Sequence, residues 1–312
     1  MRDVGIIIVA YNSAAVLDSC LDAALATGAE VVVVDNGSSD DAPPVPARRG
    51  VRWITNSSNR GFAGAVNQGF SALDRPYILI LNPDAVLQTS LQPLREACDL
   101  PRAAGAGGQL LDVQGRPQIG FMVRQFPTPL VLALEALLLN RVWPGNPVNA
   151  AYRGLRLDYA ARQAVPQPAG AFLMVRRAVW QELGGFDEEF WPLWFEDVDF
   201  CRRAAACGYL WYYTPAAVAK HTGAHSISKL KLEMRRVYWY RSLLRYSAKH
   251  FGPIAMRGVC LAVVAGSLLR ILIESALHLN LEPLAAYGRV VGLAGRLFLG
   301  RLDDQAQLVS GP

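Results

Sequence analysis

The sequence lacks the cysteine patterns that mark disulfide-stabilised or zinc-binding proteins. Its five cysteines are odd in number, scattered, and never arranged as CxxC: Cys20, Cys98, Cys201, Cys207 and Cys260. We therefore expect neither a disulfide framework nor a zinc site. A reducing cytoplasm is the simplest compartment for this chain.

No segment has the form of a secretory leader or of a membrane-crossing run. The N-terminal apolar run spans only residues 4–10, and Asp3 stands where a signal peptide carries positive charge. Residues 258–269 are uncharged, but these twelve residues fall short of the ~20 that cross a bilayer. We expect a buried first strand at the N-terminus and no membrane-spanning segment near the C-terminus.

Acidic residues are scarce in the last part of the chain. Residues 221–312 hold 12 Lys and Arg against 5 Asp and Glu, whereas the other 220 residues hold 19 against 21. Only the last part therefore has an excess of positive charge that favours an anionic partner. The whole chain of 312 residues is 52% hydrophobic and 18% charged, which excludes wholesale disorder and suffices for a large core.

Strand-like and helix-like patterns alternate in the first third of the chain. Four short runs are nearly continuous in apolar residues, as strands buried on both faces are: residues 4–10, 30–34, 51–55 and 77–81. Residues 14–26 and 61–73 between them have helical spacing. This alternation predicts an α/β protein with a parallel sheet and ligand chemistry at the carboxyl ends of its strands.

The rest of the chain is less regular. Residues 170–177 predict a further strand, followed by a helix that ends at Gly184–Gly185, and residues 209–223 predict strands around a turn at Pro215. Residues 101–167 show no clear period apart from the apolar residues 130–139, and we expect them to cover one side of the site.

A basic, aromatic segment begins at residue 229. Its cations are interleaved with Leu, Tyr and Trp: Lys229, Lys231, Arg235, Arg236, Arg241, Arg245 and Lys249. Such a helix, followed by apolar helices, is typical of segments that lie in the membrane interface. We favour this interpretation over a helical cap that packs on the catalytic domain.

Polar residues follow the first two predicted strands. Tyr11 and Asn12 come after the first, and Asp35 and Asn36 after the second, where Gly37 permits a turn. A carboxylate there can accept hydrogen bonds from a nucleobase or a ribose, although it can equally cap a helix. No GxGxxG follows the first strand, which argues against a Rossmann dinucleotide site.

Two further positions have metal-binding chemistry. Asp84 follows the fourth strand in LNPDA and could hold Mg²⁺ or Mn²⁺ on a diphosphate, although an Asn-Pro-Asp turn is common. His221 follows a predicted strand and could be a nitrogen ligand to the same metal, although lone histidines are more often structural. His225 and Ser226 are alternatives for that role.

The stretch LWFEDVDFCRRA places three carboxylates behind Trp194 and Phe195: Glu196, Asp197 and Asp199. Placing a carboxylate beside large apolar groups costs free energy, unless the carboxylate has a partner or takes part in the chemistry of a site. Locally, this pattern fits both a solvated helix start and a carboxylate that takes a proton.

Seven stretches, taken in chain order, resemble those of glycosyltransferase family 2, the inverting sugar transferases of the GT-A fold: YN, VDNGSSD, NRGFAGAVNQGF, LNPDA, GAFLMVRRAVWQELGGFDEEF, FEDVDFCRRA and KHTGAHS. The likeness is to bacterial rhamnosyltransferase-like members that extend cell-wall or O-antigen glycans. It implies a GT-A catalytic domain over residues 1–228, with a mostly parallel central sheet flanked by helices. Residues 229–312 would form a C-terminal helical extension at the membrane surface.

The resemblance also implies roles for single residues. The donor would be bound by a set near the strand ends: Tyr11, Asn12, Asp35, Asn36, Gly61, Phe62, Asn67, Asn82 and Asp84. Asp84 and His221 would hold the metal. Asn82 stands where the family's Asp-x-Asp has its first acid, which removes one negative charge from the site.

On the acceptor side, the resemblance makes Asp197 the catalytic base. We expect Trp194 and Phe195 to stack on a sugar and Glu196 to contact an acceptor hydroxyl. Asp199 is expected to cap its helix or to pair with Arg202 or Arg203.

These assignments predict an inverting glycosyltransferase with a divalent metal, Mg²⁺ or Mn²⁺, as cofactor. The first candidate donor is dTDP-L-rhamnose, followed by UDP-sugars, and the acceptor is a glycan or lipid-linked glycan. As a partner we expect an anionic membrane surface at the inner face of the plasma membrane, and we expect no nucleic acid. Whether the protein forms a homo-oligomer is left open.

Two alternatives belong to other classes. A sugar nucleotidyltransferase would need a cationic, glycine-rich loop after the first strand, and AYNSAAVLD has no such cation. A non-catalytic binding protein on the same fold would not need its acids and histidine, which are intact: Asp35, Asp84, Asp197 and His221.

Overall fold

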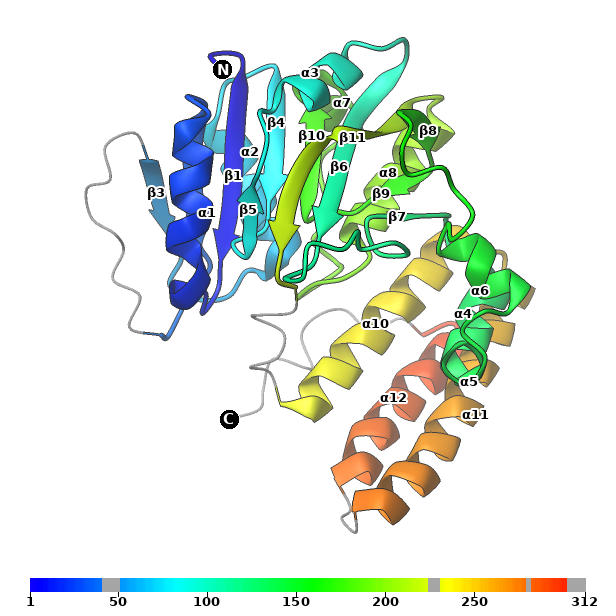
Figure 1. Ribbon diagram of the computed structural model, residues 1–312. Coiled ribbons are helices and arrows are strands. Elements are labelled where there is room, and N and C mark those ends of the chain that lie inside the picture. Colours follow the sequence, from blue (N-terminus) through cyan, green and yellow to red (C-terminus); the bar gives the residue numbers. More distant parts are fainter. Residues whose placement is uncertain (41–50, 224–230, 279–281, 302–312) are drawn as a thin grey trace. The chain divides into compact units, whose positions relative to one another are not determined.

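The computed structural model describes residues 1–40, 51–223, 231–278 and 282–301 (Figure 1). The chain divides into two compact units. The first contains Met1–Phe126, Arg153–Glu188 and Glu196–Lys229, and the second contains Pro127–Tyr152, Glu189–Phe195 and Leu230–Pro312. The last transition between the units lies next to the expected boundary at residue 228, but two earlier segments also belong to the helical unit.

The first unit is built on a nine-stranded sheet with the order β3-β2-β1-β4-β10-β6-β11-β5, and β8 pairs with β11. Its first half is parallel and consists of β1 (Val4–Ala10), β2 (Glu30–Asp35), β3 (Val51–Thr55) and β4 (Tyr77–Leu81). The connecting helices α1 (Ala14–Ala26) and α2 (Gly61–Ala72) lie on opposite faces of the sheet (Figure 1). The predicted α/β class is confirmed.

The second half of the sheet is mixed in direction. β10 (Phe172–Arg176) is antiparallel to β4 and to β6 (Ala103–Leu111), while β6 is parallel to β11 (Leu210–His221). β5 (Ala85–Leu87) and β8 (Gln163–Val165) are antiparallel to β11. β7 (Val123–Arg124) and β9 (Gln167–Pro168) form a separate pair. The helices of this half are α3 (Gln92–Cys98), α7 (Arg177–Leu183) and α8 (Glu196–Ala206).

β11 is one strand rather than two strands around a turn. Its register against β6 shifts between Thr214 and Val218, across Pro215, which has no N–H to donate to a ladder. A bulge therefore absorbs the proline where the sequence indicated a turn.

β6 has the unusual sequence AAGAGGQLL, without the β-branched residues by which strands are recognised. Its glycines are required by close neighbours. A Cβ on Gly105 would lie 2.1 Å from the carbonyl oxygen of Met174, and one on Gly108 would lie 2.3 Å from the Phe172 ring. Neighbouring groups thus occupy the space that side chains would fill.

The second unit is helical. It contains α4 (Pro129–Ala136), α5 (Leu139–Val142), α6 (Pro147–Tyr152), α10 (Leu232–His250), α11 (Pro253–His278) and α12 (Glu282–Phe298). The last three helices pack on one another, and α4 packs on α11. Buried Arg270 of α11 donates to the backbone oxygens of Glu135 and Ala136, which fixes α4 on α11.

α11 is longer than the sequence pattern indicated. The helix continues beyond the uncharged residues 258–269, and Pro253–Leu277 is long and apolar enough to cross a bilayer. Length and composition alone are weak evidence for a crossing, since core helices share both.

Gly105→Ala should destabilise the first unit by about 1–3 kcal/mol, because the added methyl meets backbone that cannot move aside. Denaturant unfolding measures the change. Gly145→Ala is the control, since a Cβ there meets nothing within 4 Å, and its effect should stay within about 0.5 kcal/mol. Equal unfolding midpoints for the two variants would contradict the packing described for β6.

Candidate active site

The predicted donor residues gather at one edge of the sheet. β2, β1 and β4 are parallel neighbours, with Ala10 opposite Asp35 and Ile8 opposite Leu81. Their carboxyl ends therefore meet, and the segments that follow lie side by side: Tyr11 and Asn12 after β1, Asn36 after Asp35, and Asn82–Asp84 after β4. Tyr11 and Asp35 are half-buried, so both keep surface for a ligand.

Asn36 is buried and its side-chain amide is used inside the protein. Its Nδ2 donates to Asn59 Oδ1 (2.9 Å) and to the Gly61 carbonyl (3.1 Å). Its Oδ1 accepts from the Arg60 N–H (3.0 Å) and from Asn56 Nδ2 (3.2 Å). Asn36 therefore holds the loop that leads into α2.

Asn12 connects the loops after β1 and β2. Its backbone has a φ of 51°, in the left-handed region that Asn tolerates. Its Oδ1 accepts from the backbone N–H groups of Ser39 (2.8 Å) and Asp40 (3.2 Å). Asp35 Oδ1 accepts from the Ser38 N–H (3.1 Å). These contacts fix the loop that follows Asp35.

Asn67 on α2 positions the loop after α7. Its Nδ2 donates to the Phe186 carbonyl and to Glu188 Oε1, both at 2.9 Å, and its Oδ1 accepts from the Phe186 N–H (3.0 Å). Half-buried Phe62 lies nearby, with its ring 6.4 Å from that of Phe186.

Asp84 and His221 form a buried pair, with 3.4 Å between Oδ1 and Nε2. Their side chains come together because β5 pairs with the end of β11, with Ala85 opposite His221. The Thr222 N–H donates to the Asp84 carbonyl (3.1 Å) and extends this pairing by one bond. Both residues are less than a tenth exposed. Backbone pairing, rather than loop flexibility, sets their separation.

Gln118 determines which nitrogen of His221 carries the proton. Its Nε2 donates to the His221 carbonyl (2.8 Å), so its Oε1, 3.0 Å from Nδ1, must accept. Nδ1 is then protonated, and the Nε2 lone pair faces Asp84 and the Asn82 amide (3.4 Å). The Phe121 ring stacks on the imidazole at 5.4 Å.

This pair fits a divalent metal ion. Histidine ligands of metals are typically oriented by a hydrogen bond from the other ring nitrogen, and a carboxylate oxygen suits Mg²⁺ and Mn²⁺. Within the described ranges there is no group of three or more His, Cys, Asp and Glu placed to hold a metal. Two protein ligands would leave positions for a diphosphate and water. His225 and Ser226 lie outside the described residues.

Asp197 lies in the first turn of α8 and is half-buried. Its Oδ2 accepts from the Gly170 N–H (2.9 Å) and Gln167 Nε2 (3.4 Å), and its Oδ1 accepts from the Val198 N–H (2.8 Å). Burial raises the pKa of Asp197, whereas these backbone hydrogen bonds and the positive charge of Arg124 oppose the rise. A raised pKa increases the strength of Asp197 as a proton acceptor.

A short stretch of backbone connects Asp197 to the Asp84 turn. The Asn82 N–H donates to the Ala171 carbonyl (3.0 Å), and the preceding residue, Gly170, holds Asp197. A Cβ on Gly170 would lie 3.1 Å from Asp197 Oδ2. Gly170–Ala171 thus connects the Asp197 carboxylate to the turn that carries Asp84.

The segment of residues 118–124 borders both Asp197 and the Asp84–His221 pair. Gln118 and Phe121 contact His221, while the Arg124 guanidinium lies 5.6 Å from the Phe121 ring and its charge acts on Asp197. The sequence did not identify these residues, or Gln167 and Gly170, as part of the site. Residues 118–124 carry no periodic signal. The sequence predicts Gly170 only as the first residue of the strand at residues 170–177, without a role in the site.

The other two acids of the stretch differ from Asp197. Glu196 is 6% exposed, and its Oε2 has no hydrogen-bond partner. Burial, with the nearby charges of Asp197 and Asp199, raises the pKa of Glu196 well above the ordinary range. Asp199 is fully buried and pairs with Arg203 at 2.8 Å, one of the roles expected for it.

Trp194 and Phe195 belong to the second unit and both have positive φ angles, 75° and 70°. Such backbone is strained for aromatic residues and is often found at functional sites. The Phe195 ring is buried and packs on Tyr246 at 5.4 Å. Trp194 is half-buried, so it keeps more surface for a sugar than Phe195 does.

The model of a known family, described as glycosyl transferase family 2, matches residues 5–184. The chain belongs to this family. It is therefore a glycosyltransferase, as the resemblance of its motifs predicted.

Two rhamnosyltransferases are similar over much of the chain. N-acetylglucosaminyl-diphospho-decaprenol L-rhamnosyltransferase of Mycobacterium tuberculosis is 30% identical over 256 residues, 73% of this chain and 81% of that protein. Rhamnosyltransferase WbbL of Escherichia coli is 26% identical over 59% of this chain and 66% of its own length.

Solved structures agree with the GT-A fold. The mannosyltransferase PcManGT of Pyrobaculum calidifontis, in complex with GDP-Man and Mn²⁺, has a TM-score of 0.52 at 18% identity, over 96% of this chain and 88% of that one. GalNAc-T7 with UDP, GalNAc and Mn²⁺ has a TM-score of 0.55 at 13% identity, over 80% and 50%.

Asp197→Asn should lower turnover about 10²–10⁴-fold, because an amide cannot accept the proton. Donor affinity should change little, since the substitution keeps the shape of the side chain. Initial rates and calorimetric donor binding measure the two effects. Asp74→Asn, on a fully exposed side chain, is the matched control. Near wild-type turnover in Asp197→Asn would exclude Asp197 as the base.

Glu196→Gln should stabilise the protein increasingly as pH rises. The raised pKa means that the folded state binds the Glu196 proton more tightly than the unfolded state. Wild-type stability therefore falls as pH rises from the ordinary carboxyl pKa, about 4.3, through the folded pKa. Glutamine has no such loss. Melting temperatures from about pH 4 upward should diverge in favour of the variant, and a constant difference would refute the buried neutral acid. Exposed Glu96→Gln is the control.

Proposed function

We propose that the protein transfers a hexose from a nucleotide-diphosphate donor to a hydroxyl of a lipid-linked glycan, with inversion at the anomeric carbon. The first candidate donor is dTDP-L-rhamnose. The observation that carries the proposal is the hydrogen-bonded connection through Gly170 and Ala171 between Asp197 and the turn that carries Asp84, which is paired with His221. The choice of sugar and acceptor is supported by the name of the mycobacterial relative, a rhamnosyltransferase of a diphospho-decaprenol glycan.

On the donor side, Tyr11, Asn12 and Asp35 would bind the nucleoside at the carboxyl ends of β1 and β2. Gly61 and Phe62 would line the neighbouring wall. Asn36 and Asn67 would contribute through the loops that their amides hold, since both amides already have partners.

Asp84 Oδ1 and His221 Nε2 would hold Mg²⁺ or Mn²⁺, with Asn82 beside them. The metal ion would supply positive charge to the diphosphate leaving group. Gln118 would keep the imidazole in the metal-binding tautomer, because its amide bonds to two atoms of His221.

Asp197 would remove the proton of the acceptor hydroxyl while that oxygen attacks the anomeric carbon. General base catalysis contributes about 10²–10⁴-fold, equivalent to about 3–5 kcal/mol of barrier. The Gly170 N–H orients the carboxylate before the acceptor binds. We keep Glu196 and half-buried Trp194 as candidate acceptor contacts and assign Phe195 to packing on Tyr246.

The acceptor's lipid would place the reaction at the cytoplasmic face of the plasma membrane. The basic excess of residues 221–312 supports this location, because anionic lipids attract such segments by ~1 kcal/mol per Lys or Arg near the surface.

A panel of dTDP-rhamnose, UDP-glucose and GDP-mannose, tested by thermal shift with and without Mn²⁺, identifies the donor. We expect dTDP-rhamnose with Mn²⁺ to raise the melting temperature most. Asp84→Asn and His221→Gln should lose the Mn²⁺-dependent part of that shift, whereas Asp197→Asn should keep it. A larger shift with another sugar nucleotide would overturn the donor choice, and an unchanged shift in Asp84→Asn would overturn the metal assignment.

A further inference from the structure

One side of α11 is apolar and uncovered. Ile254, Leu261, Leu268 and Leu272 follow one another at intervals of seven or four residues, which places them along one side of a helix. They are 87%, 59%, 52% and 71% exposed. We call these four residues the α11 face. It extends about 27 Å along the helix, and exposed Arg257 lies beside it, three residues after Ile254 and four before Leu261.

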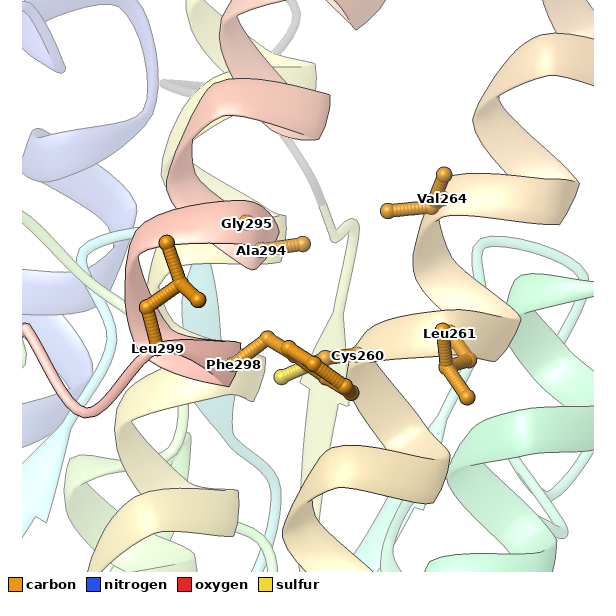
Figure 2. Close-up of a pocket in the computed structure, with 7 residues that line it drawn as sticks. All are labelled: Cys260, Leu261, Val264, Ala294, Gly295, Phe298 and Leu299. Atoms are coloured by element: carbon orange, nitrogen blue, oxygen red, sulfur yellow. The ribbon is translucent and has the colours of Figure 1, made fainter.

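A hollow of about 290 Å³ between α11 and α12 adjoins this face. Its lining is entirely apolar (Figure 2): Cys260, Leu261, Val264, Ala294, Gly295, Phe298 and Leu299. Leu261 belongs to both the lining and the α11 face, so the hollow is continuous with that face. A Cβ on Gly295 would meet nothing within 4 Å, which leaves this wall of the hollow open.

Arginines border the hollow. Arg257 donates to the Phe298 carbonyl (3.3 Å), and its guanidinium lies 5.8 Å from the Phe298 ring. Exposed Arg296 lies one turn after Gly292, with a guanidinium nitrogen 3.7 Å from where a Cβ on that glycine would be. Residues 254–273 and 283–301 contain no Asp or Glu. The apolar surface therefore has a positively charged border.

The buried side of α11 is covered by neighbouring helices. α4, α10 and α12 pack on it. Its buried Arg270 donates to backbone of α4, and Glu274 pairs with Arg236 (3.4 Å) and Tyr287 (2.9 Å). A helix packed against its neighbours in this way, with polar groups turned inward and an apolar side exposed, suits a position on a membrane better than a crossing of it.

We propose that the α11 face and the adjoining hollow are the surface by which the protein seats on an anionic bilayer. Lipid chains contact Leu261, Leu268 and Leu272, and lipid phosphates pair with Arg257 and Arg296. Charge complementarity favours lipid over a second copy of the chain, because residues 254–273 and 283–301, which form this surface in the described part of the chain, include no acid. The inference rests on the proposed function for one point only, the reason why the protein needs a membrane.

Co-sedimentation of the full-length protein with vesicles tests the surface. The vesicles consist of phosphatidylcholine alone or of an equal mixture with phosphatidylglycerol. The double variant Leu268→Glu/Leu272→Glu should bind the mixed vesicles at least about tenfold more weakly. Arg257→Gln and Arg296→Gln should each weaken that binding about fivefold, which is the effect of ~1 kcal/mol per charge, and leave binding to phosphatidylcholine unchanged.

Leu155→Glu, at an exposed leucine of the first unit, is the matched control and should bind as the wild type does. Circular dichroism checks that each variant is folded. Undiminished vesicle binding by the double variant, or equal wild-type binding to both vesicle types, would overturn the proposal. So would a dimer in light scattering that Leu268→Glu converts to a monomer without any vesicle binding.

Sugar transfer to a water-soluble acceptor separates this inference from the proposed function. The α11 variants should retain that transfer, since none of the changed residues belongs to the catalytic site. If no donor supports transfer while vesicle binding follows the expected pattern, the proposed function fails and the membrane surface stands.

Discussion

The short backbone stretch Gly170–Ala171 connects the main parts of the candidate active site. Ala171 accepts a hydrogen bond from Asn82, beside Asp84, and Gly170 donates one to Asp197. The two residues before β10 therefore set the position of the Asp84 turn and of the Asp197 carboxylate together. A side chain at residue 170 would crowd Asp197, so the identity of this residue bears directly on the geometry of the site.

The same site concentrates carboxylates that differ in environment. Asp199 is paired with Arg203, Glu196 has an unpartnered oxygen and a strongly raised pKa, and Asp197 is hydrogen-bonded yet half-exposed. Only Asp197 combines access for a hydroxyl with a preset orientation. Separation of neighbouring acids by environment is a general route to one proton acceptor among several carboxylates. It also limits the repulsion that three ionised groups would produce.

The sequence predicts an element correctly where the burial that shapes the element also sets its local pattern of apolar residues. β1, β3, β4 and α1 match their predicted bounds, because buried parallel strands and amphipathic helices leave continuous or periodic apolar signals. It failed where distant residues decide the outcome: β6 depends on Met174 and Phe172 filling the space above its glycines. Gln118 and Arg124 act on residues far along the chain, and Phe195 is covered by Tyr246. No local pattern carries such information.

The pH dependence of kcat/KM tests whether Asp197 takes the acceptor's proton. The acidic limb of the profile should lie above the ordinary Asp value of about 3.9, because burial raises the pKa of Asp197. It should move to still higher pH in Arg124→Gln, which removes a nearby positive charge. An acidic limb that stays in place in Arg124→Gln, or that persists unchanged in the residual activity of Asp197→Asn, would contradict the account.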